Sequence, residues 1–394
     1  MSDEVAKRKQ PKCQGAMSYT EEPHHKTNPR ARTLFASGEG QEYTERFSSL
    51  RRRTVTVGAA AYSLGEKYRK NASRYYDCSK AVTFNEWADN ETGEIKYTYG
   101  SGKPCRQRLC PCCQHLKSRV LVTQLQQVYE HHMQEMPDSI GLLLTLTVKN
   151  CTGDNLRDTV KQMHHSFGKL RRRVEFEGAV RGFFRSTEVT RNKENGTYHP
   201  HMHVLLMVPR RYLSKKSGLY ITHDQWCEIW QDCLGVDYRP VVGITAITQE
   251  AMQKREKRTG GALTVKGAIK EVAKYCVKPD GFQETINGRF FTDAQVFQEL
   301  FEGMRAHRLY AWGGEFDKIR KLLALPDVEG EINLDAEIEE AEKPRQNYTH
   351  IAKILMGWEK TACDGLGGYV PLSRLDLATG EVQVLYDERW SGGG

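Results

Sequence analysis

The segment from His199 to Leu206 constrains the fold of this 394-residue chain more than any other, because its histidines alternate with other residues. Side chains along a β-strand point alternately to the two faces of a sheet, so His201 and His203 share one face while apolar neighbours occupy the other. Pro200 is tolerated at the first position of such a strand, where no backbone donor is needed. The pattern predicts a strand over residues 201–208 that presents two imidazole rings together.

The residues before this strand predict its partner. Residues 182–190 form a second strand-like run, and the polar turn 191–196 is typical of a hairpin, so the two strands should lie antiparallel. Periodicity predicts further strands at 140–149 and 241–248 and helices at 116–134, 154–175, 222–233 and 263–278. Strands and helices in this order favour an α+β fold with a central antiparallel sheet and flanking helices.

Two imidazoles leave a metal site incomplete, so a third ligand must come from a neighbouring segment. Glu188 lies late in the preceding predicted strand, and the hairpin register would bring it near His201 or His203. His199 is either a further imidazole near the metal or a group that supports the ligands. A simpler alternative is that these histidines pack or titrate at the surface, but three alternating histidines beside strongly apolar residues favour a metal site.

A second informative segment covers residues 269–278. Helical spacing predicts one buried stripe, formed by Ile269, Val272, Ala273 and Cys276, and an opposite side that presents Glu271, Lys274, Tyr275 and Lys278. The pKa of a phenol is about 10, so Tyr275 is a poor nucleophile at neutral pH without help. If it attacks a phosphate, a metal would draw charge from that phosphate and a lysine, Lys274 or Lys278, would stabilise the phenolate. Glu271, one turn earlier, could activate water as a general base. The simpler alternative is an amphipathic helix whose tyrosine packs at the edge of the core.

The chain has eleven cysteines and no charged-then-apolar start typical of secretion, so we expect thiols or metal ligands in a reducing, cytoplasmic compartment. Cys110 and Cys113 form a CxxC pair, and Cys105 and Cys78 would complete four thiolates around a structural zinc ion. Cys112 lies inside the pair and competes with its neighbours as a ligand.

The net charge of +8 is unevenly distributed, because residues 327–342 contain eight acidic residues and no basic ones. Basic groups that could contact DNA phosphates include Arg171, Arg172, Arg173, Arg210 and Arg211. A solvated face is the simpler alternative for any one of these groups. The longest apolar run, residues 140–148, is far too short to span a bilayer.

Composition and patterning divide the chain into four regions. We expect a disordered polar arm at 1–53, a cysteine-rich zinc module at 54–118, a catalytic domain at 119–320, and an acidic linker and tail at 321–394. The tail includes a plausible hairpin near residues 369–386.

Three ordered segments resemble the rolling-circle replication initiators of small bacterial plasmids, in the HUH endonuclease superfamily: residues 142–147, 199–206 and 274–278. The resemblance implies a ferredoxin-like core in which His201 and His203 bind Mg²⁺ or Mn²⁺. Tyr275 would attack a phosphate in single-stranded or hairpin DNA of the plasmid origin, keep the 5′ phosphate and release a 3′ hydroxyl.

The resemblance also implies partners and the way the reaction ends. A host polymerase would extend the 3′ hydroxyl, a host helicase is expected, and no membrane partner is expected. Many proteins of the wider class carry a second nucleophilic tyrosine, whereas this chain has Glu271 one turn before Tyr275. Water-mediated termination is therefore favoured over a strand exchange between two tyrosines. Relatives also carry an upstream cysteine cluster, which supports the structural zinc.

Three alternatives use some of the same residues. An HUH-type transposase or relaxase would share the histidines and the tyrosine. The histidine-triad nucleotide hydrolases also have alternating histidines, but they are much shorter and would leave Tyr275 and the cysteines without a role. A non-enzymatic, zinc-dependent nucleic-acid-binding protein would have purely structural histidines.

Overall fold

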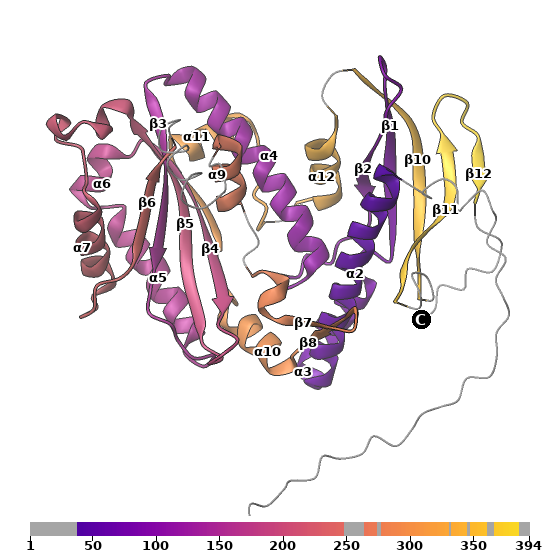
Figure 1. Ribbon diagram of the computed structural model, residues 1–394, viewed down its shortest axis with the longest axis horizontal. Coiled ribbons are helices and arrows are strands. Elements are labelled where there is room, and N and C mark those ends of the chain that lie inside the picture. Colours follow the sequence, from indigo (N-terminus) through magenta and orange to yellow (C-terminus); the bar gives the residue numbers. More distant parts are fainter. Residues whose placement is uncertain are drawn as a thin grey trace, which may run out of the picture.

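Two five-stranded antiparallel sheets stand side by side with helices between them (Figure 1). The computed structural model describes residues 38–247, 264–273, 277–330, 332–344, 347–360 and 366–385. The first sheet has the order β6-β3-β5-β4-β9, with β3 Ser139–Thr147, β4 Gly182–Arg191, β5 Tyr198–Pro209, β6 Val242–Ala246 and β9 Tyr310–Gly314. The second has the order β12-β11-β10-β1-β2, with β1 Ala81–Asp89, β2 Ile95–Ser101, β10 Tyr348–Glu359, β11 Gly368–Asp376 and β12 Val382–Val384.

Helices cover both faces of the first sheet. On one face lie α5 (Leu156–Leu170), α6 (Val174–Ala179) and α7 (His223–Leu234), and on the other lie α4 (Pro111–Glu135) and α9 (Val265–Val272) (Figure 1). Successive residues of β3 enter these two layers in turn: Leu142 and Leu144 pack with α5 and α7, whereas Leu143 packs in the core shared with α4 and α9. Burial on both faces explains why the strand is almost uniformly apolar.

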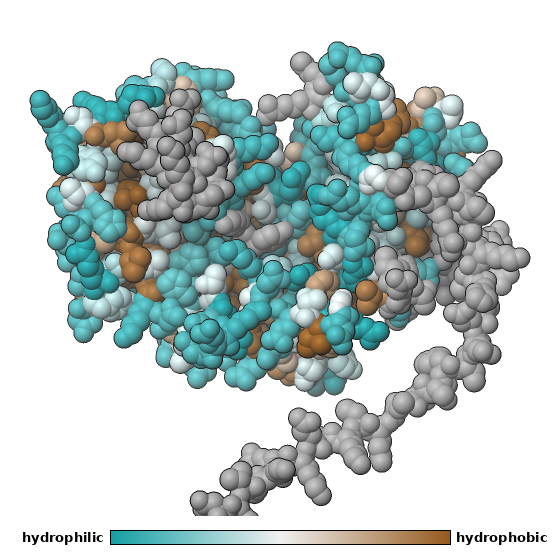
Figure 2. Space-filling view, in the orientation of Figure 1, coloured by the Kyte–Doolittle hydropathy of each residue, from teal (hydrophilic) through white to brown (hydrophobic). Residues whose placement is uncertain are grey.

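The remaining described elements connect or cover these layers. They are α2 Glu39–Ser63, α3 Glu66–Asp77, α10 Ala294–Gly303, α11 Glu315–Leu322, α12 Leu334–Glu342, the hairpin β7 Gln283–Ile286 with β8 Arg289–Thr292, and short 3₁₀ turns at Arg210–Leu213, Lys215–Ser217 and Pro279–Gly281. In the described part of the chain, no helix is both long enough and apolar enough to cross a bilayer. The face in Figure 2 is mainly hydrophilic, with apolar residues in small separate areas.

The expected α+β class and central antiparallel sheet are confirmed. The predicted hairpin pairs β4 with β5, and Glu188 stands directly opposite His201. The predicted helix near 222 begins after Thr222, whose hydroxyl accepts from the backbone N–H of Gln225 in a capping box. Local patterning was therefore sufficient for the hairpin that carries the histidines, whereas the edge strand β9 was not predicted.

The expected helix to Lys278 is wrong. Helix α9 ends at Val272 with Ala273 as its C-cap, and Lys278 has extended backbone with φ −68° and ψ 134°. Lys278 precedes Pro279, whose ring disfavours helical geometry in the residue before it. Glu271 lies in the last turn of α9, whereas Tyr275 lies outside the described residues.

Two expected regional boundaries are also wrong. Residues 39–53 belong to helix α2 rather than to a disordered arm, because Tyr43 and Phe47 pack against the ring of Phe84 in the second sheet. The region 321–394 is not only a linker and tail, since β10 pairs with β1 from Ala81 to Asp89. The predicted hairpin near 369–386 is present as β11 and β12, which extend the same sheet.

The acidic stretch has a structural role in helix α12, which lies beside the outer strand β2 (Figure 1). The Asp335 carboxylate accepts hydrogen bonds from the Tyr99 hydroxyl at 2.7 Å and the Gly102 N–H at 3.1 Å. Glu342 accepts from the Tyr99 N–H at 3.0 Å. Carboxylates thus satisfy donors at an edge of the sheet that has no further strand beside it.

Candidate functional site

Glu188, His201 and His203 converge on one face of the first sheet. The Glu188 Oε2 atom lies 3.4 Å from Nε2 of His201 and 3.3 Å from Nε2 of His203. One potential ligand atom from each residue lies within 4.8 Å of the others. The convergence follows from strand register, because β4 sets Glu188 opposite His201 and Ser186 opposite His203.

The hydrogen-bond partners of the imidazoles indicate that a cation fits between these three groups. Nδ1 of His201 lies 3.1 Å from the carbonyl oxygen of His199, which can only accept, so Nδ1 carries a hydrogen and, in the neutral ring, Nε2 presents a lone pair. That lone pair faces the carboxylate of Glu188, which is only 2% exposed. Facing acceptors in a buried site need a positive charge between them, either a proton or a metal ion.

The electrostatic state of Glu188 agrees with this requirement. Burial by itself would raise the pKa of this carboxyl, but hydrogen bonds from Nε2 of His201 and His203, which need a proton at those atoms, and the nearby charge of Lys278 outweigh burial and hold the pKa far below its usual range. Glu188 is therefore a carboxylate, the form that binds divalent cations. Two imidazoles and one carboxylate suit a metal that accepts mixed nitrogen and oxygen ligands.

Two further charged side chains reach this group from the segment that holds the predicted nucleophile. The Glu271 carboxylate oxygen Oε1 lies 3.9 Å from Nε2 of His203, and Nζ of Lys278 lies 3.3 Å from Oε1 of Glu188. The other two predicted residues, Lys274 and Tyr275, lie outside the described residues. The described residues on both sides of that gap thus contact the histidine and glutamate group.

The structure does not bring His199 into the converging set. Its Nδ1 atom lies 2.8 Å from Oδ1 of Asn150, and its ring stacks on the His201 ring with centroids 5.4 Å apart. Sequence reasoning missed Thr145, whose hydroxyl lies 3.3 Å from Nδ1 of His203 and orients that ring. A threonine inside the apolar run of β3, on the histidine-facing side, was the available signal.

The four cysteines named from the sequence form a second buried group. The Sγ atoms of Cys78 and Cys110 are 3.5 Å apart, and those of Cys78 and Cys113, and of Cys105 and Cys113, are 3.6 Å apart. A tetrahedral zinc ion with bonds of about 2.3 Å would separate its sulfurs by about 3.8 Å. The donor set and its spacing therefore fit a structural zinc ion.

The surroundings of these sulfurs also favour thiolates. The backbone N–H of Cys105 donates to Sγ of Cys78 at 3.4 Å, and that of Arg106 donates to Sγ of Cys113 at 3.2 Å. Cys112, the competing cysteine, is not part of the converging set, and its Sγ accepts from the Thr54 hydroxyl at 3.2 Å. The structure therefore groups Cys78, Cys105, Cys110 and Cys113 as possible ligands of one ion and leaves Cys112 outside that group.

The predicted DNA-contacting arginines lie at the other end of the first sheet from the histidines. Arg210 and Arg211 follow the end of β5, seven residues or about 23 Å of strand beyond His203. Arg171 follows α5 and lies 5.8 Å from the ring centroid of Phe183, near the start of β4. Arg172 is exposed, and Arg173 is shared between Glu175 at 3.6 Å and Asp232 at 3.8 Å.

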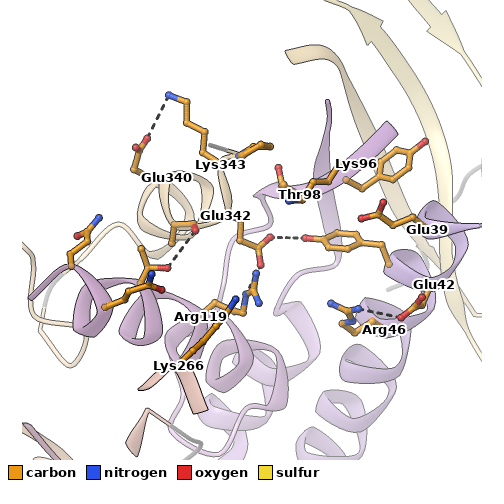
Figure 3. A pocket seen from close by; sticks show the side chains of 17 residues that line it. Glu39, Glu42, Arg46, Lys96, Thr98, Arg119, Lys266, Glu340, Glu342 and Lys343 are labelled. Atoms are coloured by element: carbon orange, nitrogen blue, oxygen red, sulfur yellow. Dashed lines mark hydrogen bonds and ion pairs between the residues drawn. The ribbon is translucent and has the colours of Figure 1, made fainter. Parts of the chain in front are cut away.

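A groove of about 900 Å³ lies between α2, α4, α12 and β2, away from the histidines (Figure 3). Its basic lining residues are Arg46, Lys96, Arg119, Lys266 and Lys343, and its acidic ones are Glu39, Glu42, Glu340 and Glu342. Glu342 accepts from the Tyr43 hydroxyl and from Arg119. Because the charges nearly cancel, this lining does not by itself favour a polyanion.

Comparison with known proteins places these features in a family. A family model described as "Replication protein" matches residues 98–363. The chain is 38% identical to "Protein rep" of Streptococcus pneumoniae serotype 2 (strain D39 / NCTC 7466) over 57% of this chain and 65% of that protein. It is 36% identical to "Protein rep" of Lentilactobacillus hilgardii over 68% of this chain and 80% of that protein.

A third relative, "Protein rep" of Bacillus amyloliquefaciens, is 31% identical over 71% of this chain and 83% of its own length. No solved structure matches the chain. The family match includes the histidine strand, the segment around Tyr275 and three of the four cysteines. The chain therefore belongs to the replication protein family, and its expected identity as a plasmid Rep initiator is confirmed at this level.

Proposed function

We propose that the protein initiates rolling-circle replication of a plasmid by nicking and joining one DNA strand at the origin, through a covalent link on Tyr275. The observation that carries this proposal is the position of Glu271 and Lys278. They flank the predicted nucleophile in the sequence, and both contact the group formed by Glu188 and the two histidines. A tyrosine between these two residues in the sequence would come within reach of a phosphate bound at that group.

In the cleavage step, the Tyr275 phenol oxygen bonds to phosphorus and the bond from phosphorus to the 3′ oxygen breaks. The 5′ phosphate remains on the tyrosine, and the 3′ oxygen leaves as a hydroxyl after taking up a proton. A bound Mg²⁺ or Mn²⁺ would draw charge from the phosphate and so make it more electrophilic. Glu188, His201 and His203 would hold that ion, while Lys274 or Lys278 would stabilise the negative charge of the phenolate.

Glu271 is proposed to end the cycle. A carboxylate beside the metal ligands would accept a proton from water, which then attacks the phosphotyrosine and releases the 5′ phosphate from Tyr275. This second reaction uses the same site and needs no second tyrosine. Hydrolysis would free Tyr275 and leave a strand end with a 5′ phosphate, whereas joining would require a 3′ hydroxyl to attack the phosphotyrosine in place of water.

A single tyrosine substitution tests the covalent step. Full-length protein is incubated with a labelled single strand of origin sequence and Mn²⁺, and peptides are then analysed by mass spectrometry. We expect a nucleotide-bearing peptide that contains Tyr275 in the wild type and none in Tyr275→Phe. Tyr220→Phe, at a tyrosine that is 37% exposed, serves as the matched control. An unchanged adduct in Tyr275→Phe would overturn the proposal.

The arginines at the far end of the sheet are proposed to bind DNA phosphates beyond the cleavage position. The double variant Arg210→Ala/Arg211→Ala should weaken binding of all sequences alike and reduce the slope of log affinity against log salt by about two. The nicking rate at saturating DNA should not change. A sequence-dependent loss would instead assign these residues to base recognition.

After cleavage, a host polymerase would extend the released 3′ hydroxyl, and a host helicase would separate the strands ahead of it.

A further inference from the structure

The end of helix α9 is attached to helix α4. The Ser118 hydroxyl on α4 donates to the carbonyl oxygen of Ala273 at 2.8 Å. Ala273 is the C-cap of α9 and is fully buried, so its carbonyl has no helical partner and needs such a donor. Glu271, which reaches His203, lies only two residues earlier. Ser118 therefore fixes the end of α9 from which Glu271 reaches the metal ligands.

The other side of the nucleophile segment is attached to helix α2. The Asp280 carboxylate pairs with Arg53 at 2.9 Å, two residues beyond Lys278. The Gln283 amide is 3% exposed and donates to the carbonyl oxygen of Arg53 at 2.9 Å and to the Thr56 hydroxyl at 3.0 Å. Residues 280–283 are thus held to one turn of α2.

Both of these helices meet at the cysteine cluster. Helix α4 begins at Pro111, next to the ligand Cys110, and Ser118 lies five residues or about 7.5 Å of helix beyond Cys113. On α2, the Thr54 hydroxyl lies 3.6 Å from Sγ of Cys110 and next to Arg53 in the sequence. The residues that contact the two sides of the segment around Tyr275, Ser118 on α4 and Arg53 on α2, therefore each lie within about two helical turns of the cysteine sulfurs.

We infer that the four-cysteine cluster, through α4 and α2, positions Glu271 and Lys278 at the histidine site and so controls the rate of the covalent step. Ser118 and Gln283 are the positioning residues. This inference rests on the proposed function, and it goes beyond a merely stabilising role for the cysteine metal. Without the cluster, the turn of α4 that contains Ser118 and the turn of α2 that contains Arg53 would no longer be fixed relative to each other.

A hydroxyl substitution separates positioning from general stability. Ser118→Ala should lower the rate constant of adduct formation about tenfold, the loss expected for one hydrogen bond that fixes a reacting group. Affinity for the origin strand and for Mn²⁺ should stay within about twofold. Ser118→Thr, which keeps the hydroxyl, should restore most of the rate.

Thr123→Ala is the matched control. Its hydroxyl lies on the same helix but donates to the Ala341 carbonyl of α12 rather than to α9. Gln283→Glu, which removes both amide donors at similar size, should act on the rate as Ser118→Ala does. Rates of Ser118→Ala and Thr123→Ala that are equal would overturn the inference.

A second measurement does not depend on nicking. Hydrogen exchange across residues 265–283 should become faster in Ser118→Ala, and also in the full-length wild type when a thiol reagent removes the cysteine-bound metal. Strands β10 and β11 provide the internal reference in Ser118→Ala. Faster exchange without any nicking activity in the wild type would reject the proposed function and the control of its rate, and would keep only the attachment of Glu271 and Lys278 to the cysteine cluster. Unchanged exchange in both samples, with nicking intact, would reject the inference alone.

Discussion

The two groups of metal-ligating side chains differ in how completely the protein encloses them. The four thiols of the cysteine group are at most 8% exposed, and together they would complete a tetrahedral coordination shell. Among the described residues the histidine group offers three ligands, and Lys278 beside it keeps half of its side chain exposed. A closed shell favours a structural ion, whereas an incomplete one leaves positions for water or a phosphate. The difference predicts that the two groups fail in different ways when a ligand is removed.

The largest expected effect is on folding, from the closed group. Cys113→Ala should lose the bound zinc and more than about 4 kcal/mol of unfolding free energy, because loss of a structural metal is one of the few causes of so large an effect from a single substitution. Thermal unfolding and zinc content per chain measure both quantities. Cys233→Ala is the control, because this buried cysteine lies outside the cluster. Equal melting temperatures for Cys113→Ala and Cys233→Ala would show that the four cysteines stabilise the fold only as buried side chains and not through a bound metal.

The next effect is on chemistry, from the open group. His203→Ala should reduce Mn²⁺-dependent cleavage about 10²–10⁴-fold, which corresponds to several kcal/mol of lost charge stabilisation in the transition state. Its melting temperature should fall less than that of Cys113→Ala. His165→Ala, at an exposed histidine on α5, is the control for the cleavage assay. A His203→Ala variant that unfolds as Cys113→Ala does would remove the contrast between the two groups.

A smaller effect should appear at a residue that supports the open group. Thr145→Val removes the hydroxyl beside Nδ1 of His203 and should weaken Mn²⁺ binding about 10–100-fold, as for other groups that orient metal ligands. Titration of free Mn²⁺ by electron paramagnetic resonance measures this affinity. Thr147→Val is the matched control, because that hydroxyl donates to the carbonyl oxygen of Val241 instead. Identical affinities would show that Thr145 does not orient His203.

The smallest effect tests how the second sheet is held without metal. Asp335→Asn should cost about 1 kcal/mol of unfolding free energy, because the hydrogen bonds from Tyr99 and Gly102 keep an oxygen acceptor but lose its charge. Glu340→Gln, on the same helix and exposed, is the control in denaturant titrations. Zinc content should stay unchanged in both variants, and a loss of zinc in Asp335→Asn would couple α12 to the cysteine cluster.

Local patterns predicted the site better than they predicted its surroundings. Glu188, His201 and His203 belong to one hairpin, so alternation and a short turn were enough to bring them together. Cys105, Cys110 and Cys113 lie within nine residues, and only Cys78 had to be added from a distance. Both sets could be proposed because most of their geometry is set by neighbours in the chain.

The second sheet gave no comparable signal. Strand β1 pairs with β10, more than two hundred residues later in the chain. The sequence of neither strand indicates which segment is its partner. Helix α2 was also not predicted at its N-terminal half, because several of its buried residues, such as Ser48 and Arg51, are polar. Its buried stripe depends on aromatic partners such as Phe84. The end of α9 was misjudged because an apolar stripe continues past Val272, whereas the cap at Ala273 depends on Ser118 from another helix.

The pairing of β1 with β10 also has a consequence for synthesis of the protein on the ribosome. Residues 81 and 348 emerge from the ribosome roughly 15–50 seconds apart, because the chain grows by about 5–20 residues per second. During that interval β1 and β2 exist as an unfinished hairpin, with the β1 edge open to other nascent chains. A message that is cut short before codon 348 would therefore release a product that lacks the middle strand of this sheet, and we expect such products to aggregate or be degraded.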